Sequence, residues 1–190
     1  MSTHATDRNA IPEVDRNRWR IDPTRSSVEF HAPNFWGLAT VKGKFERYDG
    51  TVELYKTPAI ELTIDAASLN TNNKKRDTHL RSVDFFDVAN HPQVRFVSDS
   101  ATLSGQQLKV RGHLHAAGKS IPVDLDATVR PVGDELAVEA ETHANHQHLG
   151  MTWNRLGMLR TPSKLIVHGR LVQDDNSISR PRNSACSKRS

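Results

Sequence analysis

Ten histidines are the residues of this 190-residue chain that most directly suggest chemistry. Three of them, His143, His146 and His148, lie close together, and imidazole nitrogens are common ligands of zinc, copper, nickel and iron. His113 and His115 are two residues apart, which places both on one face of a strand. The spacing at 143–148 matches no established metal motif such as HExxH. A metal-binding protein or metal-dependent enzyme that uses this cluster is therefore the alternative function, and no metal ligand is assigned.

Motifs of other enzyme classes are missing from the sequence. No GxSxG nucleophile elbow, GxxxxGK[ST] phosphate loop or GxGxxG dinucleotide fingerprint occurs. The single cysteine, Cys186, excludes an intrachain disulfide and a thiolate metal cage. No histidine stands near it in the sequence, so an exposed bystander thiol is the expected reading. These residues favour a protein that is not an enzyme.

The segments that must position these side chains alternate apolar and polar residues. Apolar residues recur at every second position within 28–32, 41–45, 60–64, 108–114, 121–129 and 136–140. Such alternation predicts strands with one dry and one solvated face, and His113 and His115 then face water. Turn residues at 48–50, 104–106, 117–119 and 132–134 separate the segments. We expect about eight strands that close into an up-and-down antiparallel β-barrel, because closure removes exposed edges.

One stretch, residues 67–92, does not alternate and is predicted to be a helical insert. Asn72 or Asn73 is expected to cap its first turn. Its apolar side chains include a narrow helical stripe and the residues that follow it: Leu80, Val83, Phe85 and Phe86. We expect the insert either to lie over one mouth of the barrel or to plug that end as ordinary core.

Composition and charge limit the domain count and the partners. Hydrophobic residues make up 36% of the chain and charged residues 25%, and the length suits one domain. Residues 1–17 and 174–190 are polar and are predicted to be disordered tails on one domain over 18–173. The net charge is +4, but residues 1–17 carry −1 and 175–190 carry +3, which leaves +2 for the body. No nucleic-acid partner is expected, since such domains show a basic face.

Membrane association is limited by the same composition. No run of about 18 apolar residues occurs, so stable membrane insertion is not expected. The first 17 residues lack the apolar core of a secretory signal, and the chain is expected in a reducing cytoplasm. Transient membrane contact stays open, because a basic C-terminal tail could touch an acidic partner or an anionic membrane through Arg180, Arg182, Lys188 and Arg189.

Three blocks of sequence carry a resemblance to a known family. The first is WRIDP at 19–23 followed by SSVEF at 26–30, and the second is VKGKF at 41–45 followed by GTV at 50–52. The third is longer and more specific: SLNT at 68–71, RDTHLRS at 76–82, DFFDV at 84–88 and HP at 91–92. On these blocks the chain resembles the YceI-like family over essentially all of residues 18–173.

The resemblance implies an extended lipocalin-like barrel that binds, transports or sequesters an apolar ligand without catalysis. The ligand would be a polyprenyl chain or an isoprenoid quinone held in the interior, with no cofactor besides this lipid. Family members are often dimeric, so a homodimer is an expectation. The chain departs from the family at Arg25 and Asn34, where members often carry histidine, and it lacks the signal peptide of many periplasmic members.

An isoprenoid offers a protein little but shape and apolar surface, and each buried CH₂ group contributes roughly 0.8 kcal/mol. The expected lipid-binding side chains come from the inward-facing strand positions, the insert and two tryptophan-containing segments. Each of them could instead fill the core. They are Phe30, Phe35, Trp36, Phe45, Leu62, Ile64, Leu80, Phe85, Phe86, Val110, Leu114, Val123, Leu125, Met151, Trp153 and Met158. A polar headgroup would need a donor, for which the candidates are Asn34, Arg76 and His79. The other reading of Arg76 is that it pairs with Asp77 and fastens the helix to the barrel.

Overall fold

The computed structural model describes residues 18–34, 39–54, 58–145, 148–149 and 162–174. This part of the chain contains eleven strands, a 3₁₀ helix η2 (Ala66–Ser68) and an α-helix α1 (Lys74–Arg81). The strands are β1 (Arg18–Ile21), β2 (Ser27–Asn34), β3 (Ala39–Phe45), β4 (Tyr48–Glu53), β5 (Ala59–Asp65), β6 (Leu69–Asn70), β7 (Gln93–Ser104), β8 (Gln107–Ala116), β9 (Lys119–Val132), β10 (Glu135–Ala144) and β11 (Ser163–Gln173).

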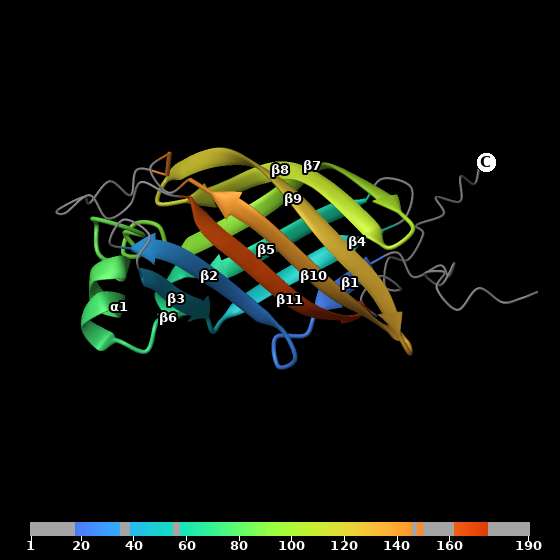
Figure 1. Ribbon diagram of the computed structural model, residues 1–190, viewed down its shortest axis with the longest axis horizontal. Helices are drawn as coiled ribbons and strands as arrows, with labels where there is room; N and C mark the ends of the chain where they lie inside the picture. The colour runs from blue at the N-terminus through green and yellow to red at the C-terminus, as the bar shows by residue number, and fades with distance from the viewer. Residues whose placement is uncertain (1–17, 35–38, 55–57, 146–147, 150–161, 175–190) are drawn as a thin grey trace, which may run out of the picture.

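Eight of these strands close into an antiparallel barrel (Figure 1). The hydrogen-bonded order is β1-β4-β5-β7-β8-β9-β10-β11, and β11 pairs back with β1 through Trp19 opposite Gln173 and Ile21 opposite Leu171. Each of these strands pairs in an antiparallel sense with its neighbours. The predicted barrel of about eight strands is therefore confirmed.

Strands β2, β3 and β6 extend the wall at one end of the barrel. β2 pairs with residues 164–168 of β11, β3 pairs with β2, and β6 pairs with the last two residues of β3. The chain bends between β1 and β2 and again between β3 and β4. Because β1 pairs with β4 and β2 pairs with β3, the same wall continues across both bends. Figure 1 shows this extension at the left, beside α1.

The turn predicted at 48–50 is wrong, because these residues belong to β4. The chain bends instead at Glu46 and Arg47, whose backbone N–H groups both donate to the Ser68 hydroxyl, at 3.1 and 3.0 Å. Gly50 pairs with Leu62 of β5, and a side chain there would come within 3.0 Å of the Glu61 carbonyl oxygen. This glycine therefore allows two strands to approach closely, and it looks like a turn residue only in sequence.

The helical insert predicted over 67–92 is much shorter than expected. Leu69 pairs with Phe45 as part of β6, and Asn72 takes a left-handed φ of 60°, so the helix begins only after Asn73. Asn73 caps it, as one of the two expected alternatives, by accepting from the Arg76 N–H at 3.1 Å. Turns follow Arg81. No helix among the described residues is long and apolar enough to cross a membrane.

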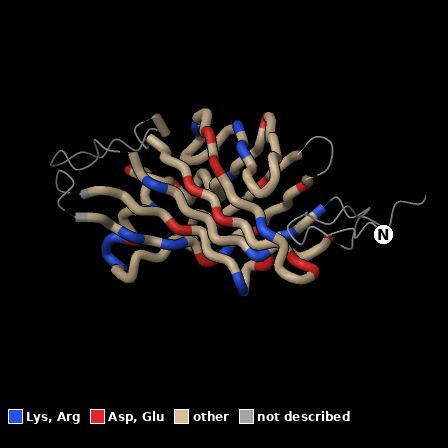
Figure 2. Tube along the Cα trace, turned by 45° about the vertical axis from the view of Figure 1, so that its right-hand side comes forward, with Lys and Arg blue, Asp and Glu red and all other residues tan. Residues whose placement is uncertain are grey.

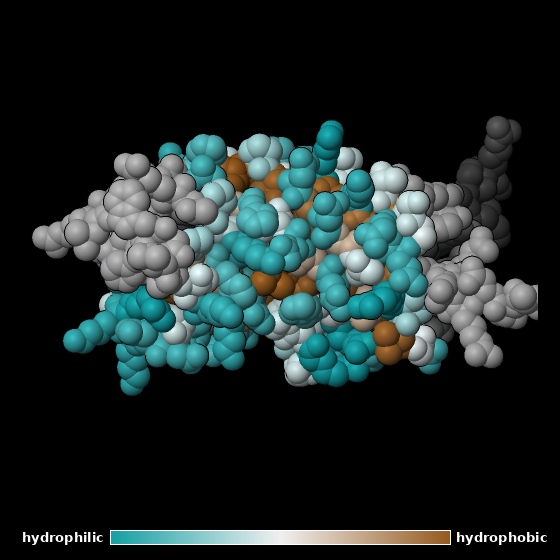
Figure 3. All heavy atoms as spheres, in the orientation of Figure 1, coloured by the Kyte–Doolittle hydropathy of each residue, from teal (hydrophilic) through white to brown (hydrophobic). Residues whose placement is uncertain are grey.

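The inward faces of the strands build a single core. The alternation at 108–114 and 121–129 is confirmed by burial that follows the same period in β8 and β9. The largest side chains with almost no exposure are Leu69, Val110, Val129 and Leu136. The outer surface in Figure 3 is mostly hydrophilic, with small hydrophobic areas between polar side chains. Apolar side chains therefore gather inside the barrel.

Candidate functional site

The interior of the barrel contains an apolar cavity of about 230 Å³. Its walls come from nearly every strand, and polar atoms contribute almost nothing to them. Ten of the sixteen side chains predicted to bind lipid line it: Phe30, Phe45, Leu62, Ile64, Leu80, Phe85, Phe86, Leu114, Val123 and Leu125. The barrel is therefore hollow as well as closed, which is the arrangement that an apolar ligand requires.

The remaining predicted side chains do not take part in this cavity or cannot be placed. Val110 is buried in the core but does not line the cavity. Five others lie outside the described residues: Phe35, Trp36, Met151, Trp153 and Met158.

Several lining residues were not expected from the sequence. Val94 and Phe96 come from β7, and Leu165, Val167 and Leu171 come from β11. The alternation in β11 is weakened because Ile166 and Val172 are apolar as well. In β7 the register shifts between Ser98 and Ser100, which moves the inward parity from Val94 and Phe96 to Ala101 and Leu103. The sequence signal for inward residues is the alternation of apolar and polar side chains. The bulge in β7 and the outward apolar residues in β11 obscure it.

An aromatic wall connects the barrel to the segment that follows α1. The rings of Phe30 and Phe45 lie 5.7 Å apart, and Phe86 meets Phe45 edge-on at 5.9 Å. Gly43 makes room for this wall, since a Cβ there would lie 2.4 Å from Cζ of Phe30. Leu80 and Phe86 are half-buried and line the cavity, so the insert lies over this end of the barrel.

Hydrogen bonds to Thr71 fasten α1 to the barrel. Nε of Arg76 donates to the Thr71 hydroxyl at 2.7 Å, and its Nη2 donates to the Thr71 carbonyl at 2.8 Å. The Thr71 hydroxyl and N–H both donate to Oδ1 of buried Asp77, at 2.5 and 3.0 Å. Arg76 therefore helps to hold α1 against the barrel. Thr71 is hydrogen-bonded to both Arg76 and Asp77, in place of the direct pair that was expected between these two residues.

The other two headgroup candidates are His79 and Asn34. Nε2 of His79 lies 3.3 Å from Oδ2 of Asp84, and its ring meets Phe85 edge-on at 5.1 Å. Neither His79 nor Arg76 lines the cavity. Asn34 pairs with Ala39 through the backbone, and its side chain lies outside what the structure describes.

The histidines lie on the outside of the barrel or beyond the described residues. Nδ1 of His113 lies 2.8 Å from Oδ2 of Asp99, and the rings of His113 and His115 are 6.4 Å apart. His143 and His148 are exposed, and His146 is not described. Among the described residues, no three metal-ligating side chains come together.

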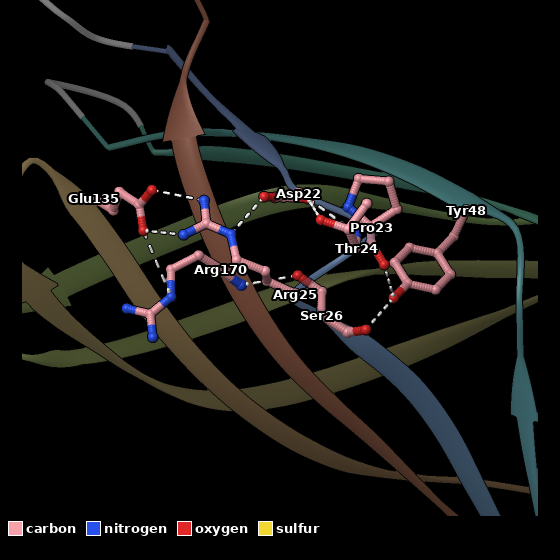
Figure 4. Close-up of polar contacts among 8 residues, drawn as sticks. All are labelled: Asp22, Pro23, Thr24, Arg25, Ser26, Tyr48, Glu135 and Arg170. Atoms are coloured by element: carbon pink, nitrogen blue, oxygen red, sulfur yellow. Dashed lines mark hydrogen bonds and ion pairs between the residues drawn. The ribbon is translucent and has the colours of Figure 1, made fainter.

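An ionic latch holds the end of the barrel opposite α1 (Figure 4). The guanidinium of Arg25 donates to both carboxylate oxygens of Glu135, at 2.9 and 2.6 Å, and to Asp22 at 2.6 Å. The Thr24 hydroxyl and Arg25 lower the pKa of Asp22 to about 2, and Glu135 raises the pKa of Arg25. Nε of Arg170 lies 3.7 Å from Glu135. Arg25 thus joins the bend between β1 and β2 to β10.

Tyr48 supports the same bend from the inside. Its hydroxyl donates to the Ser26 carbonyl at 2.5 Å and lies 3.4 Å from the Pro23 carbonyl. Burial raises the pKa of this phenol. The bend is therefore held by a neutral aromatic side chain on one side and by the ionic latch on the other.

Solved structures share this architecture at low sequence identity. BcnA of Burkholderia cenocepacia superimposes with a TM-score of 0.72 at 20% identity, over 79% of this chain and 98% of that one. A polyisoprenoid binding domain from Saccharophagus degradans, implicated in plant cell wall breakdown, superimposes with a TM-score of 0.68 at 15% identity, over 82% of this chain and 98% of that one. These likenesses establish the fold.

Sequence comparison identifies the family. Protein YceI of Escherichia coli O157:H7 is 38% identical over 103 residues, 52% of this chain and 54% of that protein. The chain thus matches about half the length of this curated relative. The model of the YceI-like domain matches residues 19–178, which include the whole barrel except Arg18. The chain belongs to the YceI-like family.

Proposed function

We propose that this protein binds and carries an apolar isoprenoid-like lipid, a polyprenyl chain or an isoprenoid quinone, without catalysing a reaction. The observation that carries the proposal is the apolar cavity inside a closed barrel. The structural similarity to a polyisoprenoid binding domain supports the ligand class. A cavity with almost no polar atoms selects ligands by apolar surface and shape, as an isoprenoid requires.

The size of the cavity sets the scale of the bound chain. A dry cavity of about 150 Å³ holds a benzene molecule, with six carbons, so a cavity of 230 Å³ takes roughly nine or ten carbons. That corresponds to two isoprene units. Burial of roughly ten carbons supplies several kcal/mol before the cost of ordering the chain. A longer ligand must extend past Phe85 and Phe86 or displace them.

Mass spectrometry of the natively purified protein and of its organic extract tests the proposal. We expect one apolar lipid per chain, which the extract would identify. If the purified protein is empty, titration with isoprenoid quinones and with polyprenyl phosphates is the second step. A protein that is empty and binds neither class contradicts the proposal.

Substitutions in the cavity wall assign the bound lipid to the barrel. Leu62→Arg and Val123→Arg each place a charge in the cavity, so we expect lipid retention to be lost. Gln107→Arg adds the same side chain on the exposed outer face of β8 and is expected to retain lipid. Because the buried charges also lower stability, Ala127→Leu provides an uncharged variant that fills part of the cavity. Retention by folded Leu62→Arg, Val123→Arg and Ala127→Leu alike would place the lipid elsewhere.

A further inference from the structure

The two ends of the cavity differ in how they are closed. At the end opposite α1, Trp19, Val129 and Leu136 are buried and pack without lining the cavity. At the α1 end, Leu80, Phe85 and Phe86 are only half-buried and line the cavity directly. Half-buried side chains on a short connecting segment can move more readily than packed strands. Among the described residues, the α1 end is therefore the less tightly packed end of the cavity.

A basic row crosses the outer wall at this end. Lys42 on β3 lies directly opposite His31 on β2, His31 lies opposite Lys164 on β11, and Lys164 lies opposite His143 on β10. With strands about 4.8 Å apart, the row is roughly 14 Å wide. It contains no acidic residue, although Glu141 of the neighbouring row reaches Lys164 at 2.6 Å. We call these four residues the basic row.

Other cross-strand neighbours on the outer wall show that this arrangement is local. Lys44 lies opposite Glu29, and Lys109 lies opposite Asp126. Opposed charges on neighbouring strands usually stabilise each other. In the basic row, Lys164 is paired with Glu141 and His31 lies 3.8 Å from Glu29, so Lys42 is the lysine of the row that has no acidic partner among the described residues.

Helix α1 adds positive charge at the same end. It begins with Lys74 and Lys75, both exposed, although the positive N-terminal end of a helix dipole favours acidic residues. Val83, directly after the helix, is 76% exposed and is the most exposed large hydrophobic side chain in the described residues. Figure 2 shows Lys and Arg gathered at the lower left, where α1 and the neighbouring strands lie. Exposed lysines and an exposed apolar side chain on one short segment are typical of surfaces that contact a bilayer.

We propose that the α1 end of the barrel, through the basic row, Lys74, Lys75 and Val83, docks on an anionic lipid bilayer while the ligand enters or leaves. The partner is a surface of headgroups because the lysines are spread over two strands and a helix and surround no pocket. Lysine ammonium groups suit such a surface, since they act as point charges without demanding one geometry. The inference rests on the proposed function, because a lipid carrier must exchange its ligand with a bilayer.

Flotation of the full-length protein with vesicles tests the docking. We expect binding to phosphatidylcholine vesicles that contain phosphatidylglycerol, weaker binding at high ionic strength, and little binding to phosphatidylcholine alone. Lys42→Gln/Lys75→Gln is expected to weaken partitioning by about 30-fold, given the contribution of each lysine near an anionic surface. Arg20→Gln/Lys109→Gln removes the same charge away from the α1 end and is expected to bind as the wild type does.

A second measurement separates docking from ligand binding. Binding of farnesol added from ethanol is expected to be unchanged in Lys42→Gln/Lys75→Gln, whereas transfer of a fluorescent prenol from anionic vesicles is expected to slow. Equal losses in both double variants, or no vesicle binding by the wild type, would overturn the docking proposal. If farnesol still binds in those cases, lipid carriage stands without docking; if farnesol does not bind, lipid carriage itself fails.

Discussion

Asp22 illustrates how a single side chain stabilises the closed end of the barrel. Hydrogen bonds from Thr24 and Arg25 lower its pKa from 3.8 to about 2, so the folded state favours the carboxylate. A depressed folded pKa gives stability that is present above pH 3.8 and is lost as the pH falls towards 2. We therefore expect the stability difference between wild type and Asp22→Asn to shrink between pH 5 and about pH 2.

Urea unfolding at several pH values measures that difference. Asp134→Asn, in the exposed turn between β9 and β10, is the matched control, and its difference from wild type is expected to stay small throughout. A difference between wild type and Asp22→Asn that does not change with pH would show that the carboxylate charge is not what holds the latch.

Gly43 and Gly169 form a second test at single residues. A Cβ at Gly43 would lie 2.4 Å from Cζ of Phe30 and 2.8 Å from Cγ2 of Thr71, both in well-packed surroundings. Gly43→Ala is therefore expected to destabilise the protein by about 1–3 kcal/mol through overpacking. Gly169→Ala places its Cβ at an ordinary 3.6 Å from Val138 and is expected to change stability by less than about 0.5 kcal/mol. Equal melting temperatures of the two variants would contradict the close packing at Gly43.

At the scale of elements, α1 depends on one hydroxyl. Thr71 accepts from Arg76 and donates to buried Asp77, so Thr71→Val removes a partner from both. We expect a loss of about 1–3 kcal/mol in stability of the segment, because a buried carboxylate loses a hydrogen bond. Hydrogen exchange should show faster exchange of the amides in 74–88 than in the barrel strands. Thr78→Val, on the exposed side of α1, is the control, and faster exchange there to the same degree would argue against a special role for Thr71.

The elements were predictable to different degrees from the sequence. Strands such as β8 and β9 face water on one side and the interior on the other, so their period of two can be read directly. Residues 48–50 resemble a turn in sequence but belong to β4, because Gly50 allows a close approach between strands that only the pairing with β5 reveals. The predicted helical insert is too long at its N-terminal end, because Leu69 pairs with β3. Tertiary contacts there outweigh the local conformational preference of the sequence.

For the whole molecule, the sequence predicts which face of each strand is dry but not whether the dry faces meet. Strand number and stagger set the width of a barrel, and neither can be read from the alternation of apolar and polar residues. The candidate site was therefore predictable as a set of inward strand residues, seven of the eight lining the cavity, but its volume was not. The same alternation predicts that His113 and His115 face outward and that Leu114 faces inward.

That volume yields a prediction for ligand length. With room for roughly ten carbons, affinity should rise from a five-carbon prenol to geraniol by about 100-fold or more. It should then rise little for farnesol and geranylgeraniol, because their additional units meet Phe85 and Phe86 at the α1 end. Isothermal titration with the four prenols gives this profile directly.

Phe86→Ala should move the limit, because Phe86 closes the cavity against Phe45 and its ring would be replaced by space for a further isoprene unit. The expected result is a selective gain for farnesol over geraniol relative to the wild type. Val83→Ala, which trims an exposed side chain of the same segment, should leave the profile unchanged. If affinity in the wild type continues to rise through geranylgeraniol, the segment after α1 yields to the chain. Longer chains would then displace the aromatic wall. The distance to the bilayer surface, and not the volume of the cavity, would limit the length of the ligand.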